Sequence, residues 1–334
     1  MTPIAISCGE PAGIGPDVVA AAHRSLGAEL PLLWIGDPRH LPQGTDWREV
    51  AGPEEVRPGP LCVLPRDFGA PRVPGRPVPT HAPQVVAAIE TGVALALEGR
   101  VSALCTAPIH KAALIDGAGF GFPGHTEFLA DLCGLGPEEV VMMLACEALR
   151  VVPATIHIPL SEVPRALTPE RLRATILIAE AALRRSFGLA APRIAVAGLN
   201  PHAGEDGKMG GEEIAFIAPL VAELRARGLD IAGPLPADTM FHDRARKAYD
   251  AALAMYHDQA LIPLKALHFD EGVNFTLGLP IVRASADHGT AFAIAGTDQA
   301  LPSATIAALK MAQAAAEHRA ASGNPAPNAI AAPQ

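Results

Sequence analysis

Three histidines follow apolar runs that have the composition of buried strands. His157 comes after VVPATI, His202 after IAVAGLNP, and His257 after AALAMY. The carboxyl ends of parallel strands share one edge of a sheet, where ligands bind, so the three side chains can converge. A lone histidine there is usually structural, but three neutral imidazoles in matching positions predict a catalytic divalent-metal site with positions open for substrate oxygens. Imidazole ligands favour zinc.

A glycine-rich turn introduces a second candidate site. In GFPGHTEF, His125 and Thr126 follow Gly124, and the helix-like TEFLADL begins at once. An imidazole, a hydroxyl and backbone N–H groups at a helix start can bind a phosphate or a carboxylate. The segment fits an ordinary helix start equally well, with Thr126 and Glu127 in the first turn.

Four basic residues stand near predicted strand ends or loop starts. They are Lys111, Lys208, Lys265 and Arg283, in a chain whose formal net charge is -9. An isolated basic side chain is usually solvated at the surface. These four indicate a local pocket for an anionic ligand only because they accompany the histidines.

The opening SCGEPAGIGPDVV resembles the strand, glycine-rich turn and helix of nucleotide-binding proteins. From Gly13 the chain reads GIGPDV, which lacks the third glycine of the dinucleotide fingerprint, and no GxxxxGK occurs. We therefore predict a tight turn near the active cleft and no ordinary Rossmann dinucleotide site.

Short apolar runs alternate with longer stretches of helical periodicity, which is typical of parallel strands joined by helices. Thr168, Pro169 and Glu170 form a helix start, and Gly188 ends that helix. The other predicted helices are Pro83–Glu98, Gly211–Arg227 and Pro302–Ala321. The predicted strands are Ile4–Cys8, Leu32–Gly36, Ala103–Thr106, Val151–Ile158, Ile194–Leu199, Ala252–Tyr256 and Ile281–Arg283.

Two segments contain too much proline or too few apolar residues for regular structure. Residues 52–83 include the run PRVPGRPVPTHAP, which excludes a regular helix or a central strand and predicts a long surface excursion. Residues 323–334 are expected to form a flexible tail.

Composition limits the class of protein. The chain has 334 residues, 49% of them hydrophobic, which is enough for one large α/β unit or for two lobes. The acidic balance and the lack of a basic run exclude nucleic-acid binding, and no apolar stretch approaches a membrane span. Five cysteines without a CxxC motif predict free, mostly buried thiols in a reducing compartment, so we expect a cytoplasmic protein.

Ordered blocks from end to end resemble the 4-hydroxythreonine-4-phosphate dehydrogenase family of pyridoxine (vitamin B6) biosynthesis. They are GEPAGIGPD, TAPIHK, GHTEF, GLNPHAGE, MGGEEI, GPLPADTMF, AMYHDQ, GVNFTLGLP and RASADHGTAFAIAG. The resemblance implies an isocitrate/isopropylmalate dehydrogenase-like α/β fold, with two α/β/α lobes around a cleft and no standard Rossmann domain. The expected lobes of this single unit are 1–125 with 255–322, and 126–254.

The resemblance also implies roles for individual residues. It makes His157, His202 and His257 ligands of one divalent ion per subunit, either Zn, Mg or Co. Its substrate-binding positions are His125, Thr126, Lys265, Asn274 and Arg283. Its cofactor-binding candidates for NAD or NADP are Asp287, His288, Gly289, Thr290 and Gly296. Ala293 stands where an acidic residue is common, and Pro123 stands where some members carry Thr, which leaves cofactor preference and fine substrate choice open.

The implied reaction is the oxidation of 4-phosphooxy-L-threonine to a 2-amino-3-oxo acid, which loses carbon dioxide to give 3-amino-2-oxopropyl phosphate. The candidate bases are Lys265, His125, Asp238 and Asp258, among which no spacing chooses. Relatives with these motifs act on threonate or erythronate phosphates or on cyclic diols. A metal-dependent phosphatase and a non-catalytic ligand sensor are the alternatives from other classes. The resemblance further implies a homodimer whose active site is shared across the interface.

Overall fold

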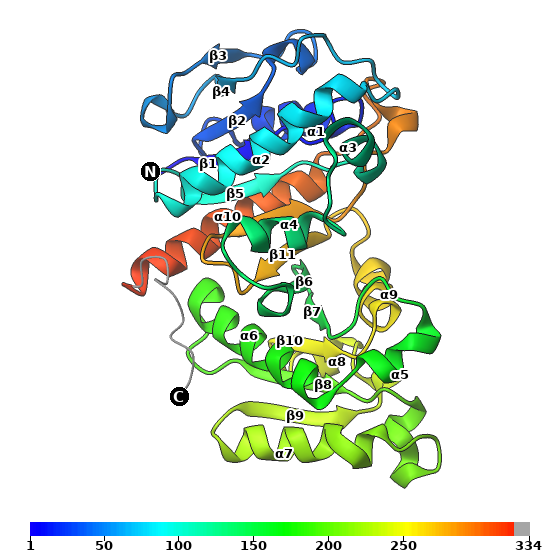
Figure 1. Cartoon of the computed structure of the whole chain (residues 1–334). Coiled ribbons are helices and arrows are strands. Elements are labelled where there is room, and N and C mark those ends of the chain that lie inside the picture. Colours follow the sequence, from blue (N-terminus) through cyan, green and yellow to red (C-terminus); the bar gives the residue numbers. More distant parts are fainter. Residues whose placement is uncertain (324–334) are drawn as a thin grey trace. The chain divides into compact units, whose positions relative to one another are not determined.

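The structure is a computed structural model that describes residues 1–323, so the tail expected at 323–334 lies almost wholly outside the described residues. The chain divides into two compact units (Figure 1). The first unit contains Met1–Pro137 and the chain from Leu279 onward, and the second contains Glu138–Gly278. These divisions lie 12 and 24 residues further along the chain than the approximate bounds expected near residues 125 and 254.

Packing explains why the chain passes between the units at these later residues. Helix α4 (His125–Leu132) packs against α2 (Ala82–Leu97), so the first unit continues beyond residue 125. Strand β11 (Val273–Leu277) pairs with β6 (Val141–Cys146), and this pairing holds the chain in the second unit until Gly278.

Every strand pair within the first unit is parallel. The strand order is β3 (Trp47–Glu49), β4 (Leu61–Pro65), β2 (Leu32–Gly36), β1 (Ile4–Ser7), β5 (Ala103–Thr106) and β12 (Arg283–Ala286). Helix α2 packs on β1, β2 and β5, whereas α10 (Ser303–Ala321) packs on β12 and β5 and contacts α1 (Gly15–Leu26). Helix α3 (Lys111–Ala118) lies beside α2.

Strand β4 contradicts the prediction that residues 52–83 hold no central strand. It pairs on one side with β2 and on the other with β3. The prolines at 58, 60 and 65 stand before the strand or at its end, so Leu61–Leu64 can donate all its ladder hydrogen bonds. The excursion expected for this region is confined to residues 66–78.

The second unit has a mixed sheet. Its order is β11, β6, β7 (Leu149–Pro153), β10 (Ala251–Ala254), β8 (Arg193–Ala197) and β9 (Asp230–Leu235). Strand β6 runs antiparallel to both β7 and β11, and the remaining pairs are parallel. The sequence analysis missed β6, β9 and β11, and it expected parallel strands throughout. A tight turn at Glu147 and Ala148 joins β6 to β7 where the predicted pattern required a helix.

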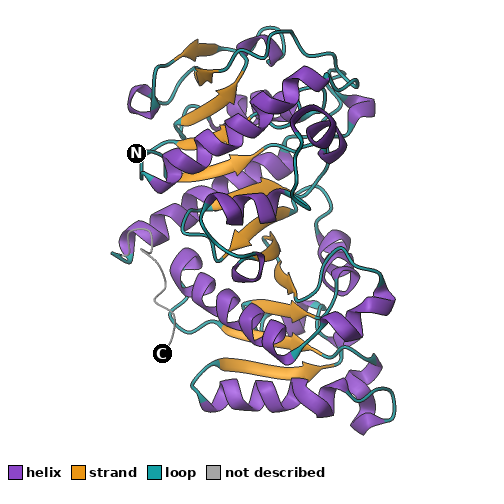
Figure 2. Cartoon of the chain, in the orientation of Figure 1, coloured by secondary structure: helices purple, strands orange, loops and turns teal. Residues whose placement is uncertain are grey.

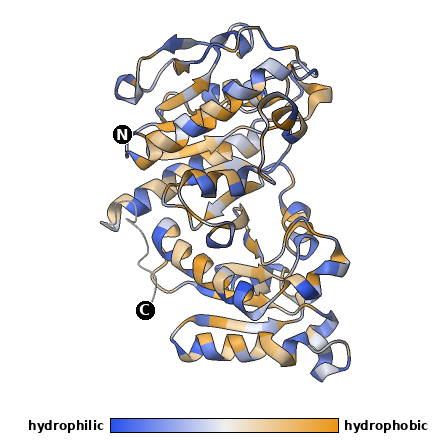
Figure 3. Cartoon of the chain, viewed as in Figure 1, coloured by the Kyte–Doolittle hydropathy of each residue, from blue (hydrophilic) through white to orange (hydrophobic). Residues whose placement is uncertain are grey.

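Alternation along the strands builds a core on each face of the second sheet. On β8, Ile194 and Val196 belong to the cluster beneath α6 (Pro169–Phe187) and α7 (Ala218–Ala226). Ala195 and Ala197 belong to the opposite cluster, beneath α9 (His257–Leu267). This period of two gives an α/β/α layering, and hydrophobic residues run along many of the strands and along the helices that cover them (Figures 2 and 3).

The four predicted helices are present, although the one expected from Gly211 begins as the π-helical η7 (Glu213–Ile217) before α7. The ends of α6 show the predicted capping. Thr168 caps α6, because its side chain accepts a hydrogen bond from the Arg171 N–H at 3.2 Å, and Gly188 ends the helix with a φ of 67°. The remaining short helices are α5 (Val163–Ala166), α8 (Asp243–Arg246), η1 (Pro38–His40), η2 (Pro53–Glu55), η3 (Pro79–His81), η4 (Pro137–Glu139), η5 (Leu160–Glu162), η6 (Pro201–Gly207), η8 (Ala237–Thr239) and η9 (Phe292–Ile294).

All five cysteines are free and four are buried, as expected. Among the described helices, none has the length and apolar character needed to cross a membrane.

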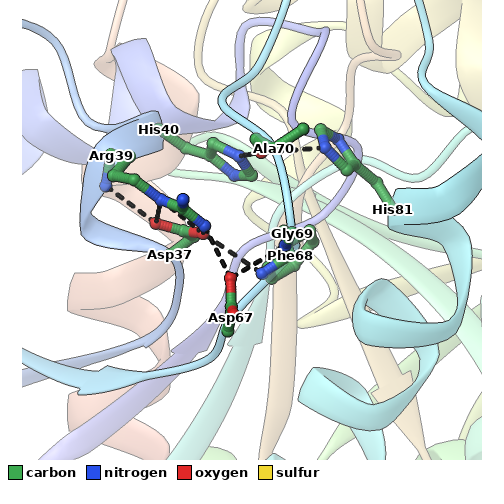
Figure 4. Close-up of polar contacts among 8 residues, drawn as sticks. All are labelled: Asp37, Arg39, His40, Asp67, Phe68, Gly69, Ala70 and His81. Carbon is green, nitrogen blue, oxygen red and sulfur yellow. Dashed lines mark hydrogen bonds and ion pairs between the residues drawn. The ribbon is translucent and has the colours of Figure 1, made fainter.

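A buried polar cluster holds the beginning of the excursion to the first unit (Figure 4). The imidazoles of His40 and His81 both donate from Nε2 to the Ala70 carbonyl, at 3.1 and 3.0 Å. Their ring centroids lie 5.0 Å apart, and both rings pack against Phe68. Asp37 accepts a hydrogen bond from the Phe68 N–H at 3.2 Å and forms an ion pair with Arg39. Burial lowers the pKa of His40 to about 4 and also lowers the pKa of His81.

Candidate active site

His157 and His257 lie together in the second unit, at the carboxyl ends of β7 and β10. Their ring centroids are 5.7 Å apart. The two strands remain linked beyond their ends, because the Ala154 N–H donates to Ala254 O at 2.8 Å and the Thr155 hydroxyl donates to Met255 O at 2.7 Å. Strand pairing therefore brings two of the three predicted ligands to one place.

The side chain of His257 is oriented by its neighbour. Its Nδ1 lies 2.7 Å from a carboxylate oxygen of Asp258. A ligating histidine commonly has its second nitrogen bonded to a carboxylate, which fixes the ring and leaves Nε2 for a metal. A cavity of about 250 Å³ adjoins the two rings and is otherwise lined mainly by apolar groups such as Ile158, Leu160 and Val163.

His157 and His202 both have a left-handed backbone, with φ of 54° and 53°. This conformation is uncommon for residues other than glycine and costs on the order of 1–3 kcal/mol. Such outliers cluster at functional sites, where the surrounding structure maintains them. The same strain at two predicted ligands distinguishes them from ordinary core histidines.

The turn that carries His202 is left-handed over five consecutive residues, 202–206. Glu213 supports it from inside: this carboxylate is buried and accepts hydrogen bonds from the Asn200 backbone N–H at 2.8 Å and from its side-chain amide at 2.9 Å. A Cβ on Gly204 would lie 2.7 Å from a Glu213 carboxylate oxygen, so the turn can close over the carboxylate only with glycine there. Sequence reasoning missed Glu213, although MGGEEI belongs to the blocks that resemble the family.

Within residues 1–323 of a single chain, no three His, Cys, Asp or Glu side chains are grouped closely enough to hold a metal ion. The expected convergence of three histidines therefore holds for His157 and His257, while His202 lies apart from that pair on its own turn. The donor types fit a divalent cation, since the two imidazoles adjoin a cavity and Asp258 orients one of them.

In the first unit, His125 and Arg283 form an electropositive site. His125 is the first residue of α4, whose cap residue is Gly124, and its Nε2 is buried without a hydrogen-bond partner among residues 1–323. Burial, with the Arg283 cation next, holds the pKa of His125 well below its usual range, so the imidazole is neutral. Thr126 follows in the first turn of α4.

Arg283 is 2% exposed and donates to the Thr106 hydroxyl at 2.6 Å. Burial lowers its pKa to about 10, so the guanidinium remains charged at neutral pH. A buried cation beside a neutral imidazole and a helix start can bind a phosphate or a carboxylate.

Lys265 and Asn274 belong to the second unit. Lys265 is on α9, where its Nζ lies 5.3 Å from the centroid of the Phe269 ring. Asn274 is on β11, and its buried Oδ1 has no hydrogen-bond partner among the described residues, which leaves an acceptor for a ligand. Of the candidate bases, Asp258 contacts His257, and Asp238 is exposed on η8, which packs against the His202 turn.

The segment with the cofactor-binding candidates follows β12. Asp287, His288 and Gly289 come first, the Thr290 carbonyl accepts from the Ile14 N–H at 2.9 Å, and Gly296 ends the segment. The buried Nε2 of His288 has no hydrogen-bond partner among the described residues, and a Cβ on Gly289 would meet open space. The unsatisfied nitrogen of His288 is available to a polar ligand such as a nicotinamide.

The glycine-rich opening is a tight turn, as predicted, and it packs on this same segment. A Cβ on Gly13 would lie 2.7 Å from Thr290 O, so only glycine allows the approach. Gly13 thus allows a close backbone approach to Thr290. Two further residues that sequence reasoning missed contact this segment. Asp17 accepts a hydrogen bond from the Gly296 N–H, and Arg72 pairs with Asp17.

Comparisons with known proteins agree with this architecture. The family model described as pyridoxal phosphate biosynthetic protein PdxA matches residues 32–312. A protein of Roseobacter denitrificans named 4-hydroxythreonine-4-phosphate dehydrogenase is 59% identical over 93% of this chain and 96% of its own length. The structure of the enzyme of that name from Klebsiella pneumoniae is 38% identical, with a TM-score of 0.85 over 95% of this chain and 100% of that chain.

A more distant solved structure is a terephthalate 1,2-cis-dihydrodiol dehydrogenase from Burkholderia xenovorans. It is 27% identical, with a TM-score of 0.66, and the match covers 94% of this chain and 98% of that chain.

The fold and these likenesses define an α/β enzyme of the oxidoreductase class. The chain belongs to the family of the pyridoxal phosphate biosynthetic protein PdxA, the 4-hydroxythreonine-4-phosphate dehydrogenases. The family expected from the sequence blocks is thereby confirmed.

Proposed function

We propose that this chain oxidises 4-phosphooxy-L-threonine with NAD or NADP in pyridoxal phosphate biosynthesis. The C3 hydroxyl loses its proton to a base, and hydride leaves C3 for the nicotinamide. The resulting 2-amino-3-oxo acid loses carbon dioxide, because the C3 carbonyl accepts the electrons of the broken C1–C2 bond as an enolate. Protonation of the enolate at C2 then gives 3-amino-2-oxopropyl phosphate. The observation that carries the proposal is the close pair His157 and His257 at two strand ends, in a member of this family.

His157, His202 and His257 would hold one divalent ion, either Zn, Mg or Co. When bound, the ion supplies Lewis-acid chemistry that lowers the pKa of a substrate hydroxyl. Asp258 fixes the His257 ring, and the left-handed backbones direct His157 and His202. The metal requirement accounts for strain that stability alone would not favour.

The substrate's anionic groups would be bound by charged and hydrogen-bonding side chains. Arg283 supplies a fixed charge, while His125 and Thr126 supply neutral hydrogen-bonding groups. Lys265 adds a second cation, and the unsatisfied Oδ1 of Asn274 accepts from a substrate N–H or O–H. The base is one of Lys265, His125, Asp238 and Asp258. Asp258 is the least suited, since its carboxylate already bonds to His257.

We further infer a homodimer in which one active site takes histidines from two chains. His202 lies apart from the other two histidines within one chain, and large apolar side chains are exposed near all three. Leu160 is 67% exposed, Ile214 is 58% exposed, and Ile262 on α9 is 65% exposed. Exposed apolar groups around a polar site are typical of an interface that a second copy covers. The expected location is the cytoplasm, where the five free thiols stay reduced.

Two other candidate substrate classes are the phosphorylated four-carbon acids and the cyclic diols. The likeness to a dihydrodiol dehydrogenase favours the diols. The buried Arg283 favours a substrate with an anionic group, which a phosphorylated acid supplies. A metal-dependent phosphatase would release phosphate without nicotinamide, and a sensor would bind ligand without turnover.

A turnover assay decides among these. The protein is incubated with 4-phosphooxy-L-threonine, threonate 4-phosphate or erythronate 4-phosphate, with NAD or NADP and a panel of divalent ions. Reduced nicotinamide and carbon dioxide are followed together with free phosphate. Metal-dependent nicotinamide reduction with the first substrate supports the proposal, whereas phosphate release alone would replace it with the phosphatase.

A further inference from the structure

Asp17, in the first turn of α1, contacts two segments that are distant in sequence. Its Oδ1 accepts a hydrogen bond from Arg72 Nη2 at 2.6 Å, and its Oδ2 accepts from Arg72 Nη1 at 3.2 Å. The same Oδ2 also accepts from the Gly296 backbone N–H at 3.0 Å. One carboxylate thus connects the proline-rich excursion to the end of the DHGTAFAIAG segment.

The ion pair is nearly buried, because the side chains of Arg72 and Asp17 are 9% and 12% exposed. The guanidinium presents two nitrogens to two carboxylate oxygens, which is the arrangement that fixes both groups most tightly. Desolvation offsets much of the attraction in such a pair, so its presence is weak evidence for a role in stability alone. The arrangement therefore points to a role of the Arg72–Asp17 pair in fixing the conformation of the segments that it joins.

Backbone contacts complete the connection between the three segments. The Gly75 N–H donates to Ala12 O at 2.8 Å, and the Arg72 guanidinium also reaches Gly13 O at 3.4 Å. Beneath them, Ile14 and Val18 pack with Ala295 in a small apolar cluster. These contacts join three segments into one packed group: the turn at 12–17, the excursion at 72–75 and the segment at 290–296.

The segment at 287–296 has little structure of its own. Its regular part is the single turn η9, which follows Ala291 with a left-handed φ of 45°. No strand ladder orders residues 287–296, so their conformation depends on neighbouring segments. A binding loop that is ordered before its ligand arrives avoids an entropic cost on binding.

We propose that Asp17 and Arg72 are positioning residues for the nicotinamide cofactor, acting through the Gly296 N–H on the cofactor-binding segment. This inference rests on the proposed function, an oxidation that uses NAD or NADP, and adds to it that the cofactor-binding candidates at 287–296 bind the nicotinamide cofactor. Neither side chain needs to touch the cofactor. The proline-rich excursion then has a function, because it delivers Arg72 to Asp17.

Four variants separate positioning from simple stabilisation. Asp17→Ala removes the acceptor of the Gly296 N–H and leaves Arg72 buried without its carboxylate. Asp17→Asn keeps an oxygen that can accept from Gly296. The double variant Asp17→Ala with Arg72→Met also lacks the acceptor but leaves no buried charge, so its Tm should recover relative to Asp17→Ala. Asp250→Ala is the matched control, because Asp250 forms a two-nitrogen pair with Arg193 in the second unit.

Each variant is measured for Tm, for kcat, for the KM of substrate and of nicotinamide, and for amide hydrogen exchange of residues 287–297 with and without NAD or NADP. In Asp17→Ala we expect the nicotinamide KM to rise about tenfold, the loss of one charge-assisted hydrogen bond, with the substrate KM within about twofold. Exchange at 290–297 should quicken, and Asp17→Asn should recover most of the nicotinamide KM. The double variant should recover Tm but not the nicotinamide KM, and Asp250→Ala should lower Tm alone.

A nicotinamide KM that recovers together with Tm in the double variant would overturn the inference, because the pair would then be purely structural. An equal rise in both KM values, or an equal rise in the Asp250→Ala control, would overturn it too. Wild-type turnover without cofactor-dependent protection of 287–297 overturns this inference and leaves the proposed function intact. Absence of nicotinamide reduction by the wild type overturns the proposed function itself.

Discussion

The paired histidines His40 and His81 make the first unit sensitive to acid. Both imidazoles donate from Nε2 to the Ala70 carbonyl, and the Nδ1 atom of each is buried without a hydrogen-bond partner among the described residues. Protonation would add a charged N–H at a buried Nδ1 for which no described residue offers an acceptor. Burial accordingly lowers the pKa of His40 to about 4 and lowers the pKa of His81 as well.

The sign of the effect follows from proton linkage. The unfolded chain binds a proton at His40 near pH 6.5, whereas the folded protein binds it only near pH 4. The stabilisation is therefore fully present above about pH 6.5 and is lost as the pH falls toward 4. Between pH 7.5 and 4.5, His40 alone should lower the free energy of unfolding by about 2–3 kcal/mol, with a further loss from His81.

Urea unfolding followed by tryptophan fluorescence measures this, since Trp34 and Trp47 both belong to the first unit. The comparison is between the wild type and His40→Gln, whose amide can still donate to Ala70 but cannot acquire a charge. The variant should lose about 2–3 kcal/mol of the acid-induced change, and His318→Gln, at an exposed position of α10, should behave like the wild type. An unchanged acid dependence in His40→Gln would refute the reasoning.

Three further outcomes test the proposed site. Replacing any one of His157, His202 or His257 by Ala should remove most bound divalent ion and most activity without unfolding the chain; full metal occupancy in a purified variant would remove that residue from the ligand set. Arg283→Ala and Lys265→Ala should each raise the substrate KM roughly ten- to a hundredfold, with a smaller effect on the nicotinamide KM, since each loses a charge-assisted contact; unchanged kinetics in both would place the anion site elsewhere. Mixing His202→Ala chains with His257→Ala chains should restore activity toward half per mixed dimer if the histidines of one site come from two chains, and no recovery despite demonstrated subunit exchange would end the shared-site proposal.

Local chemistry explains which parts of the fold were predictable. The helix at 169–187 was found because Thr168 and Gly188 determine its ends through bonds of a few residues' span. Strand β4 is not predictable from the proline content of a window. A strand needs an N–H only at those residues that donate to its ladder, and the prolines near β4 lie before the strand or at its end. The hairpin of β6 and β7 is not predictable in this way, because both strands are buried apolar runs. The sequence of such a run does not indicate whether the strand pairs parallel or antiparallel.

The candidate site divides in the same way. The position of a histidine at a strand end can be read from the sequence, since it depends only on where an apolar run stops, and His157 and His257 follow that rule. The conformation of the loop beyond the strand cannot, because it depends on groups that arrive from elsewhere in the chain. Glu213 determines the His202 turn from thirteen residues away through Asn200, and Arg72 contacts Asp17 across an interval of 55 residues. In this protein the sequence therefore supplies the candidate reactive groups, whereas long-range polar contacts, which periodicity and motif spacing do not encode, determine how the loops present them.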